Sequence, residues 1–191
     1  MNINDLQRGN LLLIDKKYDA AIVCFLKHAE ANHADRADAY AKTAECYVRH
    51  NILSKPVPVT DQFSLVSKGN LRSAEYYYKL ALKENHAHFP SLKGLVKILP
   101  EGSEARLEAM EKCLRVQPDY LITLELGSWY FKVKNCQRAY TLYLEAQKLN
   151  PKDRSCYDCL QKVCHALGNE NEASSWKKCW DEIQKRKRRS I

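Results

Sequence analysis

The stretch that decides the fold runs from Leu124 to Pro151 and has the sequence LELGSWYFKVKNCQRAYTLYLEAQKLNP. Gly127 and Tyr130 fit one face of a first helix, and a turn is expected near Lys134. Small and aromatic residues alternate in the second half at helical spacing, namely Ala139, Tyr143 and Ala146. Small residues let two helices approach closely, aromatic rings fill the remaining space, and proline ends the second helix. The stretch therefore predicts a pair of packed helices.

The same pattern recurs along most of the chain. Pro118 precedes Pro151 by 33 residues and ends EAMEKCLRVQP, which matches EAQKLNP. The segment 9–31 repeats the arrangement of small and large residues near the N-terminus. Further positions of the pattern are Ala44, Tyr47, Ala74, Tyr78, Ala81, Tyr157, Leu160, Gly168 and Ala173. The chain thus resembles the tetratricopeptide repeat family, whose units are helix–turn–helix pairs of about 34 residues.

This resemblance implies an all-α fold. We expect an α-solenoid of about ten antiparallel helices in five pairs, forming a right-handed superhelix. One repeat domain would cover residues 1–184, followed by a basic tail at 185–191. The scarcity of glycine and proline, six of each, argues independently against an all-β architecture.

Three places depart from the repeat pattern. The third unit, about 88–118, has a short first helix at 91–99 and Arg106 where a small residue is expected. The last helix carries Trp180 where alanine is usual, which suggests a cap on the array. The second unit contains an insertion at 51–68 with two prolines. This insertion either contacts a partner or is merely tolerated, or its residues 61–66 lengthen the following helix.

Composition leaves several partner classes open. The formal net charge of +8 favours binding to acidic proteins, nucleic acid or anionic membranes. The alternative is that the protein merely has a basic, soluble surface. The first residues lack the pattern of a signal peptide, and no apolar run is long enough to span a membrane. We therefore expect a cytoplasmic protein whose eight cysteines are reduced.

The sequence argues against a zinc site and against a cysteine–histidine catalytic pair. The cysteines and histidine clustered near the C-terminus are Cys156, Cys159, Cys164, His165 and Cys179. Cys156 and Cys164 would lie about 12 Å apart along a helix, too far to share one zinc ion. Cys164 and His165 are adjacent, so their side chains diverge by about 100° and form no nucleophile–base pair. Glycine pairs at 69–70 and 168–169 are expected to be turns. We predict no catalytic residue, no metal and no cofactor.

The C-terminal basic run offers a second binding hypothesis. Its residues are Lys185, Arg186, Lys187, Arg188 and Arg189. They suit contacts with nucleic acid phosphates or a nuclear import signal. The alternative is a solvated helix end, where cations favour the helix dipole.

By resemblance, first helices of successive units line a concave groove that binds a peptide or helix. The expected partner-binding residues are Leu6, Asn10, Leu13, Ala41, Lys42, Glu45, Arg49, Leu124, Ser128, Lys132, Asp158, Lys162 and His165. Co-chaperones of this family hold a partner's C-terminal carboxylate with a clamp of two lysines, two asparagines and one arginine. Here Leu6, Lys42, His88 and Leu92 stand at four of those positions. The clamp is therefore broken, and a co-chaperone role is not expected.

The preferred function is a non-enzymatic adaptor or scaffold for protein–protein interaction. One alternative is a nucleic-acid-associated protein that uses the basic tail. Another is self-association, or obligate pairing with a second protein, through the first helix, because Leu6, Leu11, Leu13 and Ile14 make that helix apolar on more than one side.

Overall fold

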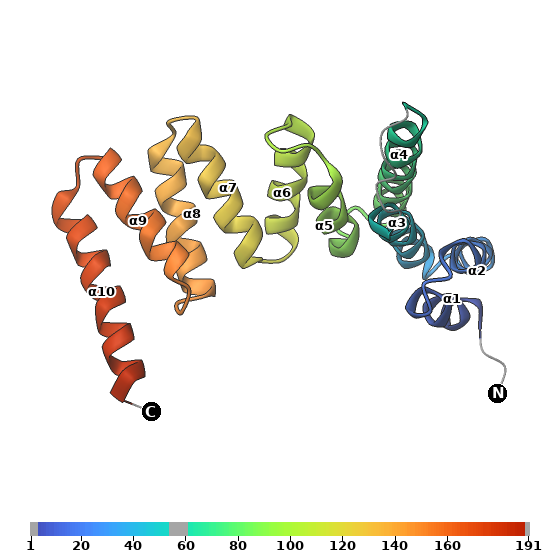
Figure 1. Cartoon of the computed structure of the whole chain (residues 1–191), viewed down its shortest axis with the longest axis horizontal. Coiled ribbons are helices and arrows are strands. Elements are labelled where there is room, and N and C mark those ends of the chain that lie inside the picture. Colours follow the sequence, from blue (N-terminus) through green and yellow to red (C-terminus); the bar gives the residue numbers. More distant parts are fainter. Residues whose placement is uncertain (1–3, 54–60, 190–191) are drawn as a thin grey trace. The chain divides into compact units, whose positions relative to one another are not determined.

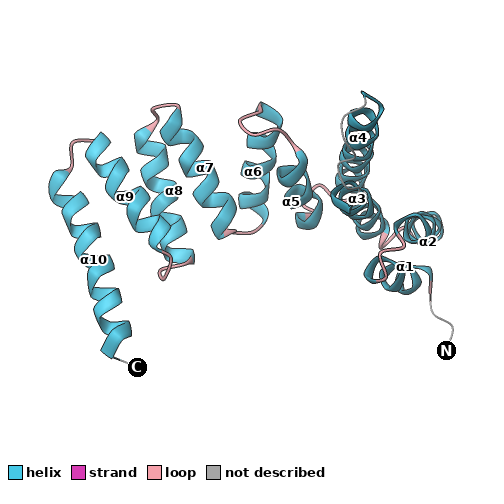
Figure 2. Cartoon of the chain, in the orientation of Figure 1, coloured by secondary structure: helices cyan, strands magenta, loops and turns pink. Residues whose placement is uncertain are grey.

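The computed structural model describes residues 4–53 and 61–189, with side chains for 4–50 and 71–185. Every regular element in these ranges is an α-helix (Figures 1 and 2), so the predicted all-α fold is confirmed. The ten helices are α1 (Asp5–Ile14), α2 (Tyr18–Ala31), α3 (Arg36–Leu53), α4 (Asp61–Glu84), α5 (Phe89–Ile98), α6 (Glu104–Val116), α7 (Tyr120–Lys132), α8 (Cys136–Leu149), α9 (Arg154–Ala166) and α10 (Glu170–Arg189).

The chain divides into two compact units, residues 1–109 and 110–191, which we describe separately. The boundary falls within α6. The single domain over 1–184 and the right-handed superhelix therefore stay predictions. None of the described helices is both long and apolar enough to cross a membrane.

The first helix pair of unit 1 shows the predicted packing of a small residue against a ring. Gly9 of α1 lies so close to the ring of Phe25 in α2 that a Cβ atom there would overlap it. Asn4 begins α1 with a capping box, because its side chain accepts the backbone N–H of Gln7 at 2.8 Å. Close backbone approach and a fixed helix start together align the pair.

The second pair, α3 and α4, is longer than a standard repeat. Residues 61–66 belong to α4, so the interpretation that they lengthen this helix is confirmed. Residues 54–60 lie outside the described residues, as do the insertion's side chains, and its contact with a partner stays a prediction. The turn expected at Gly69-Asn70 is wrong, because both residues lie inside α4. An interior glycine costs a helix only about 1 kcal/mol, which the remaining helix-forming residues offset.

The irregular third unit keeps its short first helix. Pro90 lies in the first turn of α5, where its missing N–H has no helical partner in any case. Gly102 has φ of 72°, a left-handed conformation that favours glycine, and it turns the chain toward α6. Arg106 uses its guanidinium to donate a hydrogen bond to the Leu99 carbonyl at 3.0 Å. This bond gives the large residue at a small-residue position a structural role.

Unit 2 packs around tyrosine and tryptophan. Gly127 of α7 lies against Tyr143 of α8, as the sequence pattern predicts. Farther along, the buried ring of Tyr157 in α9 lies 6.2 Å from Trp176 and 5.3 Å from Trp180 of α10, centroid to centroid. These aromatic contacts fix the last helix onto the unit, in agreement with the capping role expected for Trp180.

Candidate functional site

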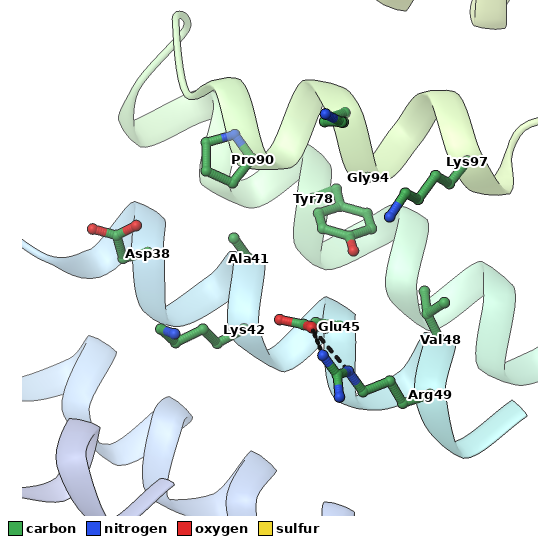
Figure 3. A pocket seen from close by; sticks show the side chains of 11 residues that line it. Asp38, Ala41, Lys42, Glu45, Val48, Arg49, Tyr78, Pro90, Gly94 and Lys97 are labelled. Carbon is green, nitrogen blue, oxygen red and sulfur yellow. Dashed lines mark hydrogen bonds and ion pairs between the residues drawn. The ribbon is translucent and has the colours of Figure 1, made fainter. Parts of the chain in front are cut away.

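A hollow lies between α3 and α5 of unit 1 (Figure 3). We call it the α3–α5 hollow, and its volume is about 490 Å³. The lining residues are Asp38, Ala41, Lys42, Glu45, Val48, Arg49, Tyr78, Pro90, Lys93, Gly94 and Lys97. Those of α3 and of α5 recur every three or four residues, so each helix turns one face toward the hollow.

Close packing of α5 on α4 shapes one wall of this hollow. Ala41 projects only a methyl group from α3, and Gly94 lies where α5 meets Tyr78 of α4. A Cβ atom at Gly94 would overlap the ring of Tyr78, which shows how closely α5 approaches α4. Burial raises the pKa of Tyr78 to about 12, and the carboxylate of Glu45 adds to the effect. Tyr78 is thus a neutral hydroxyl at neutral pH.

Most of the acidic charge of the hollow is already paired. Glu45 accepts hydrogen bonds from Nε and Nη2 of Arg49 at 2.8 and 2.6 Å. Asp38 Oδ1 lies 3.0 Å from Nε2 of His88, whose Nδ1 lies 2.8 Å from the Ser91 hydroxyl. His88 is buried at the start of α5, so this contact ties α5 to α3.

Three of the predicted partner-binding residues, Lys42, Glu45 and Arg49, lie together in this hollow, and so does Ala41. The predictions for the first helix pair are less well placed. Leu13 is only 8% exposed and belongs to the core, so it is not open to a partner. Leu6 packs against the same core, while Asn10 is half-buried. Helix α1 carries apolar residues on two of its faces. In the structure, the face with Leu6 and Leu13 packs against α2.

The predicted residues of unit 2 also divide into packed and exposed groups. Leu124 packs against the core, and Ser128 donates to the Leu124 carbonyl at 2.9 Å. Lys132 and Lys162 are exposed. The remaining two are exposed or half-buried but have partners within the chain: Asp158 pairs with Arg154 at 3.3 Å, and His165 Nδ1 lies 2.8 Å from Glu170. Whether these four contact a partner stays a prediction.

Sequence reasoning missed the contribution of α5. The family alignment pointed to His88 and Leu92, but both are buried and neither presents a cation. Lys93 and Lys97 line the hollow instead. Their spacing of four residues around Gly94 was the available signal, because residues four apart share a helix face.

The buried cysteines are structural in character. All eight are free thiols, and Cys46 and Cys164 are fully buried. Burial raises the pKa of Cys46 to about 12 and that of Cys164 to about 11. Since the thiolate is the nucleophile and the metal ligand, these side chains are poor candidates for either role. Within residues 4–50 and 71–185, no group of three histidine, cysteine or acidic side chains is placed to hold a metal ion.

Two further predicted surfaces are only partly described. Lys185 is exposed near the end of α10, but the side chains of residues 186–189 lie outside the described residues. On α1, Leu11 is 53% and Ile14 74% exposed, so the predicted apolar seam is narrowed to these two residues. Neither surface shows what would bind it.

Comparison with known proteins supports the fold. No protein-family model matches the chain, and no curated protein matches its sequence. Two solved structures of MamA resemble the chain at 15% and 14% identity, with TM-scores of 0.65 and 0.68. They cover 99% and 97% of this chain, which in turn covers 98% and 92% of theirs. A MamA fragment from Desulfovibrio magneticus RS-1, at 14% identity and a TM-score of 0.59, covers 93% of the chain, which covers 91% of it. These likenesses show a helical solenoid of the tetratricopeptide type.

Proposed function

We propose that this chain is a non-enzymatic protein-interaction scaffold whose unit 1 binds a partner segment in the α3–α5 hollow. The observation that supports this most is the hollow itself, about 490 Å³ in volume and formed by facing sides of α3 and α5. It combines apolar surface from Val48 and Pro90 with charged side chains, a mixture common in recognition surfaces.

The helices make this surface largely preorganised. Arg49 is held by Glu45 within α3, and His88 links the start of α5 to Asp38. These two side chains are already held before a partner binds, which reduces the entropic cost of association. A helical or extended segment would suit a groove between two helices.

The exposed residues of unit 2 extend the proposal. The residues Lys132, Asp158, Lys162 and His165 are proposed as a second, separate contact surface in unit 2. These residues follow the family pattern and are argued from resemblance and exposure alone. The main support for the proposal is therefore the hollow, and variants of unit 2 are included in the same binding experiment.

The test begins with affinity capture from the native source and identification of the partner by mass spectrometry. The purified partner is then titrated calorimetrically against the wild type and two double variants, Lys42→Glu/Arg49→Glu and Lys132→Glu/Lys162→Glu. We expect the first double variant to bind at least about tenfold more weakly, because it reverses two charges at the contact. Circular dichroism checks that each variant remains folded.

Unchanged affinity of the Lys42→Glu/Arg49→Glu variant would contradict the assignment of the hollow. Weakening in the second variant alone would move the partner site to unit 2. A matched control is Lys83→Glu, since Lys83 is exposed on α4 and does not line the hollow.

A further inference from the structure

We infer that the segment bound in the α3–α5 hollow is an acidic peptide segment of a protein, carrying aspartate or glutamate side chains. This rests on the proposed function, because it names the chemistry of the partner at that same site. Three observations support it: the balance of charge, the lack of partners for two lysines, and the covered ring of Tyr78.

The charge of the hollow is positive. Four cations line it, Lys42, Arg49, Lys93 and Lys97, against two carboxylates, Asp38 and Glu45. Both carboxylates already have cationic or hydrogen-bonding partners, at 2.6 Å from Arg49 and 3.0 Å from His88. A positive surface of this kind attracts negative partners and repels basic ones.

Lysine amines without partners are the groups that an acidic segment would engage. Among the described residues, neither Lys42 nor Lys97 makes a hydrogen bond or an ion pair. They come from opposite helices, so lysine side chains of both helices border the space between α3 and α5. Lys93 lines the hollow as well, but it already has contacts within the chain, among them the Phe89 ring, whose centroid lies 5.6 Å from its amine. Each amine has three donors, and hydrogen bonds between ions are about twice as strong as neutral ones.

The shape of the hollow favours a peptide over a nucleic acid strand. Single strands are bound chiefly by stacking bases on aromatic faces. The one aromatic side chain that lines the hollow, Tyr78, is buried, and Gly94 covers its ring. Ala41, Val48 and Pro90 instead provide apolar surface for the methylene groups of a glutamate side chain.

The test uses a fluorescein-labelled peptide of alternating glutamate and alanine, about ten residues long, which spans two helices about 10 Å apart. Matched peptides replace glutamate with glutamine or lysine, and an oligothymidylate of equal length is the nucleic acid probe. Fluorescence anisotropy measures binding to the full chain at low and moderate salt. We expect the glutamate peptide alone to bind, and more weakly as salt rises.

Three lysine variants locate the binding. Lys97→Glu is expected to weaken binding of the glutamate peptide about tenfold, Lys97→Arg to retain most of it, and the control Lys83→Glu to leave it unchanged. No binding of the glutamate peptide would overturn the inference. The inference would also be overturned if the glutamine peptide bound as tightly as the glutamate peptide, or if Lys83→Glu weakened binding as much as Lys97→Glu. The same holds if oligothymidylate bound as tightly as the glutamate peptide and lost as much affinity in Lys97→Glu.

The two proposals fail separately. If the purified partner depends on Lys97 but the glutamate peptide does not bind, the hollow remains a partner site and its acidic specificity is wrong. If neither the partner nor the peptide depends on Lys42 and Lys97, both proposals are wrong.

Discussion

The helix pairs α3–α5 in unit 1 and α7–α9 in unit 2 begin in the same way. In each pair, the residue that precedes the second helix is tied to the start of the first. His88 before α5 lies 3.0 Å from Asp38, and Asp153 before α9 accepts the hydroxyl of Tyr120 at 2.7 Å. The two units thus use one positional device with different chemical groups.

The pairs differ beyond this bridge. In unit 2, Tyr120 and Leu124 of α7 pack against a buried cluster formed by Ala146, Cys156 and Tyr157. In unit 1, charged side chains of both facing helices line the α3–α5 hollow, together with Ala41. Within one repeat architecture, the two junctions thus differ in their side chains: a cluster rich in aromatic rings lies at the junction in unit 2, whereas a hollow lined mainly by charged side chains lies between α3 and α5 in unit 1.

The largest expected effect comes from removing the aromatic filling of unit 2. Tyr157→Ala should lower the free energy of unfolding by about 3–5 kcal/mol, because the buried ring contacts both Trp176 and Trp180. Urea denaturation followed by tryptophan fluorescence measures this directly, since all three tryptophans lie in unit 2. The control Leu121→Ala, at a 67% exposed position in the same unit, should change little. A loss under about 1 kcal/mol for Tyr157→Ala would contradict the comparison.

A smaller effect is expected from crowding the close contact between α7 and α8. Gly127→Ala places a Cβ atom 2.8 Å from Cε1 of Tyr143, too close for an ordinary contact. Alanine favours a helix over glycine by about 1 kcal/mol, but overpacking a core costs about 1–3 kcal/mol, so we expect a net loss.

A second substitution tests this cause. With Tyr143→Leu beside it, Gly127→Ala should cost less than it does alone, because the ring that it meets is gone. Thermal and urea unfolding of the two single variants and the double variant measure the coupling. A more stable Gly127→Ala variant would show that the Tyr143 ring yields without cost.

The smallest effect concerns the bridge itself. Tyr120→Phe removes the hydroxyl that donates to Asp153 and should cost about 1 kcal/mol. Hydrogen bonds from Tyr120 and Ser155 favour the carboxylate, so the pKa of Asp153 lies below its ordinary value of 3.8. Its stabilising contribution is therefore complete above that value and is lost as the pH falls through the lowered pKa.

The pH dependence gives this prediction its own readout. Tyr120→Phe should raise the pKa of Asp153 toward 3.8, as measured by NMR titration of the carboxyl group. The free energy of unfolding should then fall less steeply as the pH is lowered. An unchanged pKa would show that the Ser155 backbone alone holds the carboxylate. Asp38→Asn makes the matching change to the unit 1 bridge.

The sequence by itself was enough to predict the helix pairs. Gly9 with Phe25 and Gly127 with Tyr143 are pairs of small and large residues sixteen positions apart, and both pairs meet in the structure. Such contacts within one repeat are local, so spacing and residue size predict them. The same local pattern correctly indicated the short α5, whereas the extension of α4 from residue 61 was one of several open alternatives that the structure selected.

Only the tertiary structure decided which residues form the α3–α5 hollow. Lys97 belongs to the hollow because α5 packs beside α3, some fifty residues earlier in the chain, with Gly94 against Tyr78. Likewise, Leu13 and Ile14 are adjacent and equally apolar, yet the first is buried and the second is 74% exposed. Helical periodicity specifies that a face exists, but which face is covered depends on the neighbouring helix, and that contact is not encoded by spacing within one segment.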